Sequence, residues 1–476
     1  MLLNYRDHYY VTTICAGLLA KFCFWRHYTL WFLPFLMFYV LLKNMENKTP
    51  RHNFILGYLF GIGYFASSLY WVHLSFDYVN LSKIGIIANI LLVLYLAIYP
   101  ALSCYVSQKF SPQNYVFFAF AWCFFEYIRG IMFTGFPWNL IGYATYDLPY
   151  FKQFASVCGI YGVSFAYMLI ICLSFSRKTL KYSALIAFIV MTYGWYMEEF
   201  NQGILAEESD VKVTIVQPCI SQRDKMDRSM LMNNLNIHIS LSDFEQVYRG
   251  KRLIIWPEAA ISAGESVDYI CSCISYSDTY IFTGADRIDS QGHVYNSSFV
   301  IGKNQGILAE YDKKHLLPFG EFIPNFLLMF GLKKVTSGIA NFSRGTKNRL
   351  ISVENIPEFA PLICYESAFP GETIENGKRP KWIVNITNDA WFSESDEIYQ
   401  HLRTIVFRAI EEGLPIIRCA NTGISCVIDC KGRIIKMLPE NAEGIINTAI
   451  PNRIINTLYS KYRKALNRYL IFYKHC

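Results

Sequence analysis

The second half of the chain holds three residues with complementary chemistry: Glu258, Lys313 and Cys364. Each lies at or just beyond an apolar run of the kind that forms a β-strand. A carboxylate, an amine and a thiol are the groups that an enzyme needs to take an acyl group onto sulfur and pass it on. About two hundred residues of largely apolar sequence precede them. An acyl-transfer site attached to such a region points to a lipid substrate.

Taken one at a time, these residues have ordinary alternatives. Pro257 would fix a turn from which Glu258 projects, either as a general base or as a surface glutamate. Lys313 is followed by Lys314, and either ammonium is suited to stabilise an oxyanion or to remain solvated. A cysteine at a strand end, such as Cys364, is more often inert packing. As a nucleophile it would have Lys313 nearby to lower its pKa.

The composition of the chain divides it into two parts. With 476 residues, at least two domains are expected. The chain is 53% hydrophobic and 17% aromatic, but long apolar runs dominate only the first 200 residues, and an ordinary soluble α/β pattern follows from about residue 210. The net charge of +7 is modest and spread out. This is typical of basic joints beside a membrane, so no nucleic-acid partner is expected.

Seven apolar runs predict membrane-spanning helices, because about 20 apolar residues are needed to cross a bilayer. They cover residues 10–25, 28–43, 54–76, 85–108, 115–134, 154–176 and 180–197. Placing the N-terminus in the cytoplasm puts most basic joint residues on the cytoplasmic side, as the positive-inside rule requires. These residues are Arg6, Lys43, Lys48, Arg51, Lys109, Arg177, Lys178 and Lys181. Seven crossings then place everything after residue 200 outside the cytoplasm.

The fourteen cysteines do not form a recognisable metal-binding pattern. Cys271 and Cys273 have no second Cys or His cluster nearby, and Cys426 and Cys430 lack a second pair. Neither a metal nor any other cofactor is predicted.

From residue 211 onward, short β-rich runs alternate with helical stretches, which predicts a layered α/β fold with two sheets or one large one. The predicted strands cover residues 211–216, 253–256, 280–284, 297–302, 361–364, 382–386, 416–420 and 424–429, and the predicted helices cover 228–249 and 398–412. Such folds place their chemistry at strand ends, where Glu258 and Cys364 stand.

Several segments, in order along the chain, resemble a known enzyme family. Trp-Pro-Glu at 256–258, Tyr-x-Lys-x-His-Leu at 311–316 and Ile-Cys-Tyr-Glu at 363–366 are similar to the Glu-Lys-Cys segments of the carbon-nitrogen hydrolase (nitrilase) superfamily. More closely, the chain resembles the apolipoprotein N-acyltransferase family over nearly its whole length. The further matching segments are residues 71–75, 135–139, 315–324, 341–345, 388–392, 400–401, 408–411 and 421–425.

The resemblance implies a fold and a location. A multi-pass α-helical membrane domain of about seven helices is expected over residues 1–205, and an α/β nitrilase-like αββα sandwich over 206–452. A basic C-terminal tail covers 453–476. The implied location is a bacterial inner (cytoplasmic) membrane, with a cytoplasmic N-terminus and a periplasmic catalytic domain.

The resemblance also implies residue roles. Glu258 matches the base, Lys313 rather than Lys314 the lysine that stabilises the oxyanion, and Cys364 the nucleophile. The matching supporting positions are Glu321, Tyr365 and Glu366.

By the same resemblance, the acyl donor is a phospholipid, typically phosphatidylethanolamine, and the intermediate is a thioester on cysteine. The acceptor is the N-terminal amine of an S-diacylglyceryl-cysteine apolipoprotein, and the bilayer is a further partner. The residues expected to contact these lipids are Trp71, Trp138, Met226, Phe326, Phe330, Trp391 and His401. Phe326 and Phe330 belong to an apolar stretch after Glu321. We interpret that stretch as a membrane-dipping arm at the lipid entrance, with core packing as the alternative.

Two features depart from the family pattern. Met226 stands where a tryptophan is usual, which puts the lipid contact of that position in doubt. Residues 455–476 carry five basic residues where the family has an eighth span, so a short amphipathic helix on the membrane surface or a residual membrane helix is expected.

Other functions fit part of the pattern. A membrane-anchored nitrilase-type amidase would use the same three residues and pass the acyl group to water. A non-catalytic membrane receptor or transporter would not require Glu258, Lys313 and Cys364 together. A Cys–His arrangement with His315 explains less of the surrounding sequence than the glutamate and the lysine do.

Overall fold

The computed structural model describes residues 8–205, 210–245, 250–262, 266–303, 305–322, 341–354, 356–375, 378–392 and 394–463. The chain forms two compact units. The first comprises residues 1–201 together with 395–407, and the second comprises 202–394 and 408–476. The division near residue 201 lies close to the predicted limit at 205. The assignment of 395–407 to the first unit was not predicted.

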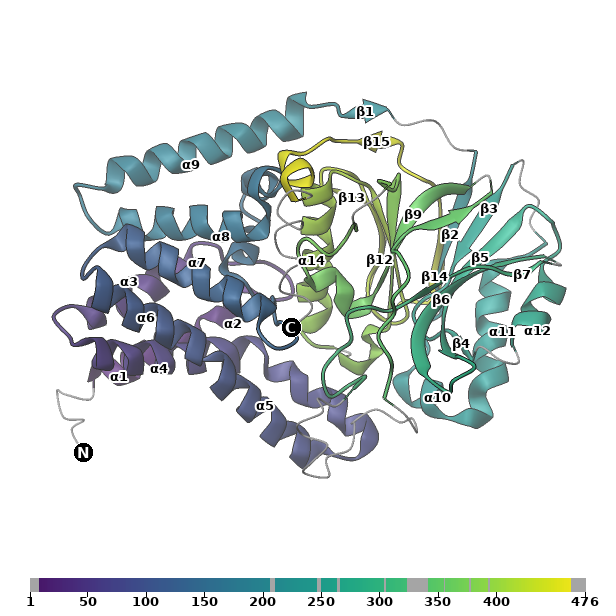
Figure 1. The fold of residues 1–476 in the computed structure, drawn as a ribbon, viewed down its shortest axis with the longest axis horizontal. Helices are drawn as coiled ribbons and strands as arrows, with labels where there is room; N and C mark the ends of the chain where they lie inside the picture. The colour runs from purple at the N-terminus through teal and green to yellow at the C-terminus, as the bar shows by residue number, and fades with distance from the viewer. Residues whose placement is uncertain are drawn as a thin grey trace. The chain divides into compact units, whose positions relative to one another are not determined.

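The first unit is helical, and each predicted span falls on one or more helices (Figure 1). Polar residues begin two of them. The Thr49 hydroxyl accepts from the His52 amide at the start of α4, and the Asn114 side chain accepts from the Phe117 amide at the start of α7. The helices are α1 (His8–Leu18), α2 (Ala20–Cys23), α3 (Leu33–Met45), α4 (Pro50–Ser68), η1 (Tyr70–Val79), α5 (Ser82–Leu96), α6 (Ile98–Phe110), α7 (Tyr115–Ile131), η2 (Ile141–Thr145), η3 (Phe151–Phe154), α8 (Ala155–Ser174), α9 (Leu180–Trp195) and η4 (Tyr196–Phe200).

Among the described residues, two helical stretches are long and apolar enough to cross a membrane, Ser82–Phe110 and Phe151–Ser174. A third is obtained when Pro50–Ser68 and Tyr70–Val79, which meet at a bend of 50°, are counted as one span. The remaining predicted spans fall on shorter helices, such as the 13 residues of α3. The figure of seven crossings therefore stays a prediction. Helix α5 exposes Ile84, Ile87 and Leu91, as a helix surrounded by lipid does.

Small residues allow α4 and α6 to pack closely. A Cβ atom at Gly57 would lie 2.7 Å from the Pro100 carbonyl oxygen, and one at Gly61 would lie 2.8 Å from the Ala97 Cα. Two glycines four residues apart place their bare backbone on one face of the helix. This is the small-xxx-small pattern by which membrane helices approach one another.

The second unit contains two large sheets (Figure 1). One has the order β13-β12-β11-β10-β9-β8, and the other has the order β14-β2-β3-β5-β6-β7 with β4 beside β5. The strands are β2 (Lys212–Gln217), β3 (Arg252–Ile255), β4 (Ile261–Ser262), β5 (Thr279–Ile288), β6 (Val294–Gly302), β7 (Gly306–Asp312), β8 (Ile351–Val353), β9 (Ile356–Ile363), β10 (Trp382–Thr387), β11 (Ile416–Ala420), β12 (Ser425–Ile428), β13 (Ile434–Leu438) and β14 (Gly444–Ala449). The parallel pairs β2–β3, β3–β5, β9–β10 and β10–β11 bring the strand ends that carry the site to one edge of each sheet.

The core of the second unit lies between the two sheets. Alternate residues of each strand face it, among them Ile255 of β3 and Val384 of β10, and the Phe282 and Phe359 rings meet edge-on with centroids 5.2 Å apart. The opposite face of the seven-stranded sheet, which includes Ile254, packs against α11 (Leu231–Ser242) and α12 (Ser266–Cys273) (Figure 1). Successive residues of a strand point to opposite faces of the sheet, and both faces are buried here. This is why these runs are almost continuously apolar.

The described part of the predicted tail, residues 453–463, packs on the second unit. Strand β15 (Arg453–Ile454) pairs with β1 (Ile204–Leu205). Arg463 is buried and forms an ion pair with Glu412, with 3.0 Å between Nε and Oε1. At least this basic residue is therefore bound to protein and unavailable to a membrane surface.

Candidate active site

Glu258 stands on a tight turn just after β3. The backbone of this turn runs against β5, where Gly284 donates its amide to the Pro257 carbonyl at 3.2 Å. A Cβ atom at Gly284 would lie 2.7 Å from the Glu258 Cα, so only glycine permits this approach. The next residue, Ala259, has a φ of +49°, a conformation that side chains disfavour. The turn thus holds the carboxylate of Glu258 in one position at the strand end.

Lys313 follows β7 and is only 1% exposed. Its Nζ lies 2.8 Å from Glu321 Oε1 and 3.4 Å from Glu258 Oε1. Burial lowers the pKa of Lys313, but attraction to the Glu321 and Glu258 carboxylates outweighs burial and holds the pKa above its ordinary value. The charged ammonium form of Lys313 is therefore favoured. Its neighbour Lys314 forms an ion pair with Glu375 outside this cluster.

Asn296 joins the two acids of the cluster. Its side-chain amide donates to Glu258 Oε1 at 2.8 Å and to Glu321 Oε1 at 2.7 Å. The second oxygen of each acid accepts from a backbone amide, that of Asn388 for Glu258 (2.9 Å) and that of Leu317 for Glu321 (2.7 Å). Both carboxylates are thus fixed at both oxygens, which is how a buried charge is kept in place.

Cys364 lies at the end of β9, with a φ of +50° as the chain enters η6 (Cys364–Ala368). Left-handed backbone at a non-glycine residue stores strain, and surrounding contacts must hold it. Glu366 supplies these contacts: it accepts from the Ile363 amide at 2.8 Å, from the Tyr311 hydroxyl at 2.7 Å and from Arg349 at 2.8 Å. Glu366 thereby ties the end of β9 to the end of β7.

The predicted tyrosine beside the nucleophile, Tyr365, is buried in an aromatic group. Its ring meets Phe369 edge-on at 4.9 Å, and Phe369 in turn stacks on His315 at 3.4 Å between centroids. His315 is also within 3.1 Å of Glu372. His315 therefore has partners outside the acid–lysine cluster.

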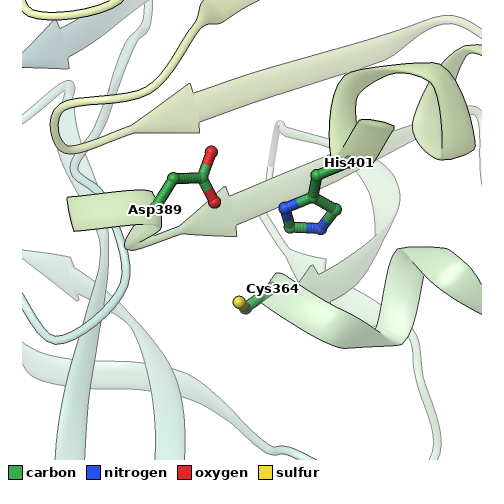
Figure 2. Close-up of side chains that lie close together, drawn as sticks. All are labelled: Cys364, Asp389 and His401. Atoms are coloured by element: carbon green, nitrogen blue, oxygen red, sulfur yellow. The ribbon is translucent and has the colours of Figure 1, made fainter. Parts of the chain in front are cut away.

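Cys364 faces the charged cluster and the turn that carries Asp389. Figure 2 shows Cys364 at the start of η6 and Asp389 on η7 (Asp389–Phe392). The Cys364 sulfur lies within 4.8 Å of an Asp389 oxygen. Burial and the Glu258 carboxylate raise the pKa of the thiol well above its ordinary value, and the opposing effect of Lys313 is smaller. The expected lowering by Lys313 is present, but burial dominates, so the resting group is a thiol that needs a base.

The structure thus brings together Glu258, Lys313 and Cys364, each from the end of a different strand, with Glu321 from the loop that follows β7. A carboxylate beside a protonated thiol can accept its proton, and a fixed ammonium can stabilise the negative charge that forms on an acyl oxygen. These are the two requirements for acylating a cysteine.

The roles of Asn296 and of the Asn388 amide were not predicted from the sequence. Asn296 lies inside β6 (Val294–Gly302), whose start was predicted at residue 297, three residues too late. A polar residue just before the predicted strand was the available signal. The contact of Asn388 is made by its backbone, so no side-chain pattern indicates it.

Three of the predicted lipid-contact residues lie together in the first unit. The Trp71 and Trp138 rings are 5.7 Å apart, and Trp138 is 5.6 Å from the His401 ring. Both indole N–H groups donate to Gln400 Oε1, at 3.2 Å and 2.8 Å. Gln400 in turn donates to the Ser68 carbonyl. The cluster is buried, and its contact with lipid stays a prediction.

The loop that carries Trp138 is fastened by two charged residues of α7. Arg129 donates to the carbonyls of Phe136 and Trp138, at 2.9 and 2.7 Å, and Glu126 accepts from the Ile141 amide at 2.8 Å. These two residues therefore bind the loop backbone, which explains why charges occur at this depth in an apolar helix.

Two of the other predicted lipid contacts belong to the second unit. Met226 ends α10 (Gln222–Met226) and Trp391 lies on η7, both partly buried, whereas Phe326 and Phe330 lie outside the described residues. Beside Met226, the Lys225 ammonium donates to the Glu258 carbonyl at 3.1 Å. Burial lowers the pKa of Lys225 to about 8.

Comparison with known proteins defines the class. Residues 16–173 match the model of the apolipoprotein N-acyltransferase N-terminal domain, and residues 212–459 match that of the carbon-nitrogen hydrolase. The apolipoprotein N-acyltransferase of Rickettsia prowazekii is 33% identical over 91% of both chains, and that of Rickettsia typhi is 34% identical over 85% of both. An amidase of the nitrilase superfamily from Nesterenkonia matches with a TM-score of 0.40 and 17% identity, over 56% of this chain and 99% of that one.

A carbon-nitrogen hydrolase domain joined to a domain of apolar helices defines a membrane-bound enzyme of the nitrilase class. Within that class, the chain belongs to the apolipoprotein N-acyltransferase family. It is accordingly an acyltransferase and a membrane protein, as the sequence predicted.

Proposed function

We propose that the chain transfers an acyl chain from a phospholipid to the N-terminal amine of an S-diacylglyceryl-cysteine apolipoprotein, through a thioester on Cys364. Phosphatidylethanolamine is the proposed donor. The chain is proposed to lie in a bacterial inner membrane with the catalytic unit on the periplasmic side.

In the first half-reaction, Glu258 takes the proton of the Cys364 thiol as the sulfur attacks the ester carbon of the donor. The Lys313 ammonium stabilises the oxyanion that forms. The tetrahedral intermediate then breaks its bond to the glycerol oxygen, which leaves with the proton from Glu258. The acyl group remains on sulfur.

In the second half-reaction, the amine of the acceptor attacks the thioester, and Glu258 takes one of its protons. The carbon–sulfur bond breaks, and the sulfur is protonated again. A thioester reacts readily with an amine, so one site can serve two bulky lipids in turn.

The observation that carries the proposal is the buried cluster of Glu258, Lys313, Glu321 and Asn296 against the strained turn of Cys364. The thiol is protonated at rest, so a neighbouring base is required, and Glu258 is fixed where it can act.

The test is incubation of the purified protein in detergent or nanodiscs with a phospholipid that carries a labelled acyl chain, without acceptor. We expect label on Cys364 that hydroxylamine removes and that Cys364→Ala lacks. Addition of a diacylglyceryl-cysteine peptide should then move the label to an amide on the peptide.

Other results support other functions. Label released as free fatty acid while the peptide is present would favour the amidase-like alternative. No adduct in well-folded protein would overturn the proposal and favour a non-catalytic role. Replacing phosphatidylethanolamine by other phospholipids tests the donor separately.

A further inference from the structure

Thr387 is a buried hydroxyl beside the nucleophile that the mechanism above does not use. It is the last residue of β10 and is completely buried. Strand β10 pairs in parallel with β9, with Ile386 beside Ile363. The next residues, Thr387 and Cys364, are therefore neighbours at the ends of the two strands, and the Thr387 side chain interacts with the thiol. The Thr387 hydroxyl also donates to Asp389 Oδ1 at 2.7 Å. A side chain that contacts the sulfur directly is placed to affect every step in which the sulfur changes charge.

Asp389 is held in place by a buried arginine. Arg418 of β11 lies 2.6 Å from Asp389 Oδ2, and its other nitrogens donate to Asn385 Oδ1 at 2.6 Å and to the Ile424 carbonyl at 3.2 Å. Figure 2 shows the Asp389 carboxylate close to the Cys364 side chain. The bare backbone of Gly423 also packs against Asp389, where a Cβ atom would come within 2.3 Å of the carboxylate.

A threonine hydroxyl has one hydrogen and two acceptor lone pairs. When it donates to Asp389, the oxygen can accept the S–H of the resting Cys364 thiol. When the sulfur is an anion, rotation of the hydroxyl lets it donate to the sulfur instead. Asp389 keeps its ion pair with Arg418 during this change, so its carboxylate is not left without a partner.

We propose that Thr387 is a catalytic hydrogen-bond donor to the anionic sulfur of Cys364, and that Asp389 and Arg418 are positioning residues for it. This rests on the proposed function because the sulfur becomes anionic only while it attacks the donor and while it leaves the thioester.

The proton balance is unchanged by this role. In the first half, the thiol proton moves to Glu258 and the sulfur electron pair forms the bond to the acyl carbon. In the second half, the carbon–sulfur electron pair returns to sulfur, which then takes a proton from Glu258. Thr387 keeps its own proton throughout and only changes the atom to which it donates.

The charged groups that act on the sulfur from within the second unit are Glu258 after β3, Lys313 after β7 and Asp389 on η7. Of these, Asp389 is neutralised by its contact with Arg418. Removing the Thr387 hydroxyl leaves all these charges in place and removes only the hydrogen bonds that it makes, including the one to Asp389.

The experiment compares Thr387→Val, Thr387→Ala and Thr387→Ser with the wild-type full-length protein. The rate of Cys364 alkylation by iodoacetamide is followed between pH 7 and 9 by mass spectrometry of the Cys364 peptide. Below the pKa this rate is proportional to the thiolate fraction. We expect Thr387→Val and Thr387→Ala to slow the alkylation of Cys364 about tenfold or more, since hydrogen bonds to charged groups are strong. In Thr387→Ser, which keeps the hydroxyl, the rate should stay within about threefold of the wild-type rate. Aminolysis of the preformed thioester should follow the same order.

The proposal would be overturned if Thr387→Val and Thr387→Ala were alkylated as fast as the wild-type protein. It would also be overturned if Thr387→Ser were alkylated as slowly as Thr387→Val. Thermal unfolding at the same temperature as the wild-type protein shows that a variant is folded. If Thr387→Val does not fold, Thr387→Ala takes its place in the comparison. The alkylation assay needs no acyl transfer. If the wild-type protein forms no thioester but the hydroxyl still controls alkylation, the proposed function fails and the role of Thr387 at the sulfur stands.

Discussion

Glu258, Lys313 and Glu321 form one buried cluster in which two carboxylates share a single ammonium. Such an arrangement is stable only as a unit, because each charge depends on the others and on Asn296 for its partners. The same dependence keeps Glu258 close to a thiol whose pKa burial has raised. Charge placement thus serves both the folded state and the proton transfer.

The first residue-scale prediction concerns the base. Glu258→Gln keeps the shape of the side chain and an oxygen that can accept from the Asn388 amide, but it cannot take the thiol proton. We expect acylation of Cys364 in a single turnover to slow by about 10²- to 10⁴-fold. A rate within a few-fold of wild type would remove Glu258 from the role of base.

A second prediction separates Lys313 from Lys314. Lys313→Met leaves two buried acids without their cation and should destabilise the second unit by about 3–5 kcal/mol, with loss of acylation. Lys314→Met, the matched control, removes a partly exposed ion pair with Glu375 and should cost at most about 1 kcal/mol. Denaturant unfolding and single-turnover acylation measure both effects. Equal effects of the two substitutions would contradict the assignment.

A third prediction is the pH dependence of the free thiol. Because the pKa of Cys364 is raised above its usual value, the thiolate fraction should still be rising at pH 9. Alkylation of wild-type Cys364 by iodoacetamide should increase about tenfold per pH unit from pH 7 to 9, without a plateau. A plateau near pH 7 would mean that Lys313 outweighs burial.

At the scale of elements, the close packing of α4 on α6 depends on glycine. Gly61→Val would push a side chain into the Ala97 backbone and should destabilise the first unit by about 1–3 kcal/mol. Ile55→Val, on the exposed side of the same helix, should have little effect. Thermal unfolding in detergent compares the two variants. If they unfold at the same temperature, the helices do not need this contact.

Elements that are buried on both faces were predicted well, and edge elements were not. Strand β11 was predicted residue for residue because all its residues except Arg418 are apolar, whereas β7 and β13, each at a sheet edge, have mixed polarity and were missed. The helix predicted over 228–249 is interrupted: α11 ends at Ser242, and Asp243 is left-handed with a φ of +43°.

The site was predictable to the extent that it lies at strand ends. Glu258 and Cys364 follow strands that could be recognised, so their strand-end positions could be expected. Their contacts with Asn296 and Thr387 could not, because these depend on how neighbouring strands align in each sheet. Register of this kind is set by the whole sheet and leaves no local pattern.

For the whole molecule, the apolar and soluble parts of the sequence correspond to the two compact units, apart from one segment. Residues 395–407 group with the helical unit although the chain on both sides of them belongs to the other. Helix α14 (Glu397–Glu412) therefore begins in one unit and ends in the other. The chain passes between its units three times rather than once, so neither unit is a continuous piece that can be cut free.

The orientation in the membrane is the remaining prediction at this scale. Basic residues in the joints place the N-terminus in the cytoplasm and, with seven crossings, the catalytic unit outside it. A phosphatase that folds only outside the cytoplasm, fused after residue 202, should therefore be active, and a fluorescent protein that matures only in the cytoplasm should stay dark there. The same two reporters fused after residue 178, in the basic joint before α9, should give the opposite result. If both sites report the cytoplasm, the number of crossings is wrong. A lipid acceptor on the outer surface could then not reach Cys364.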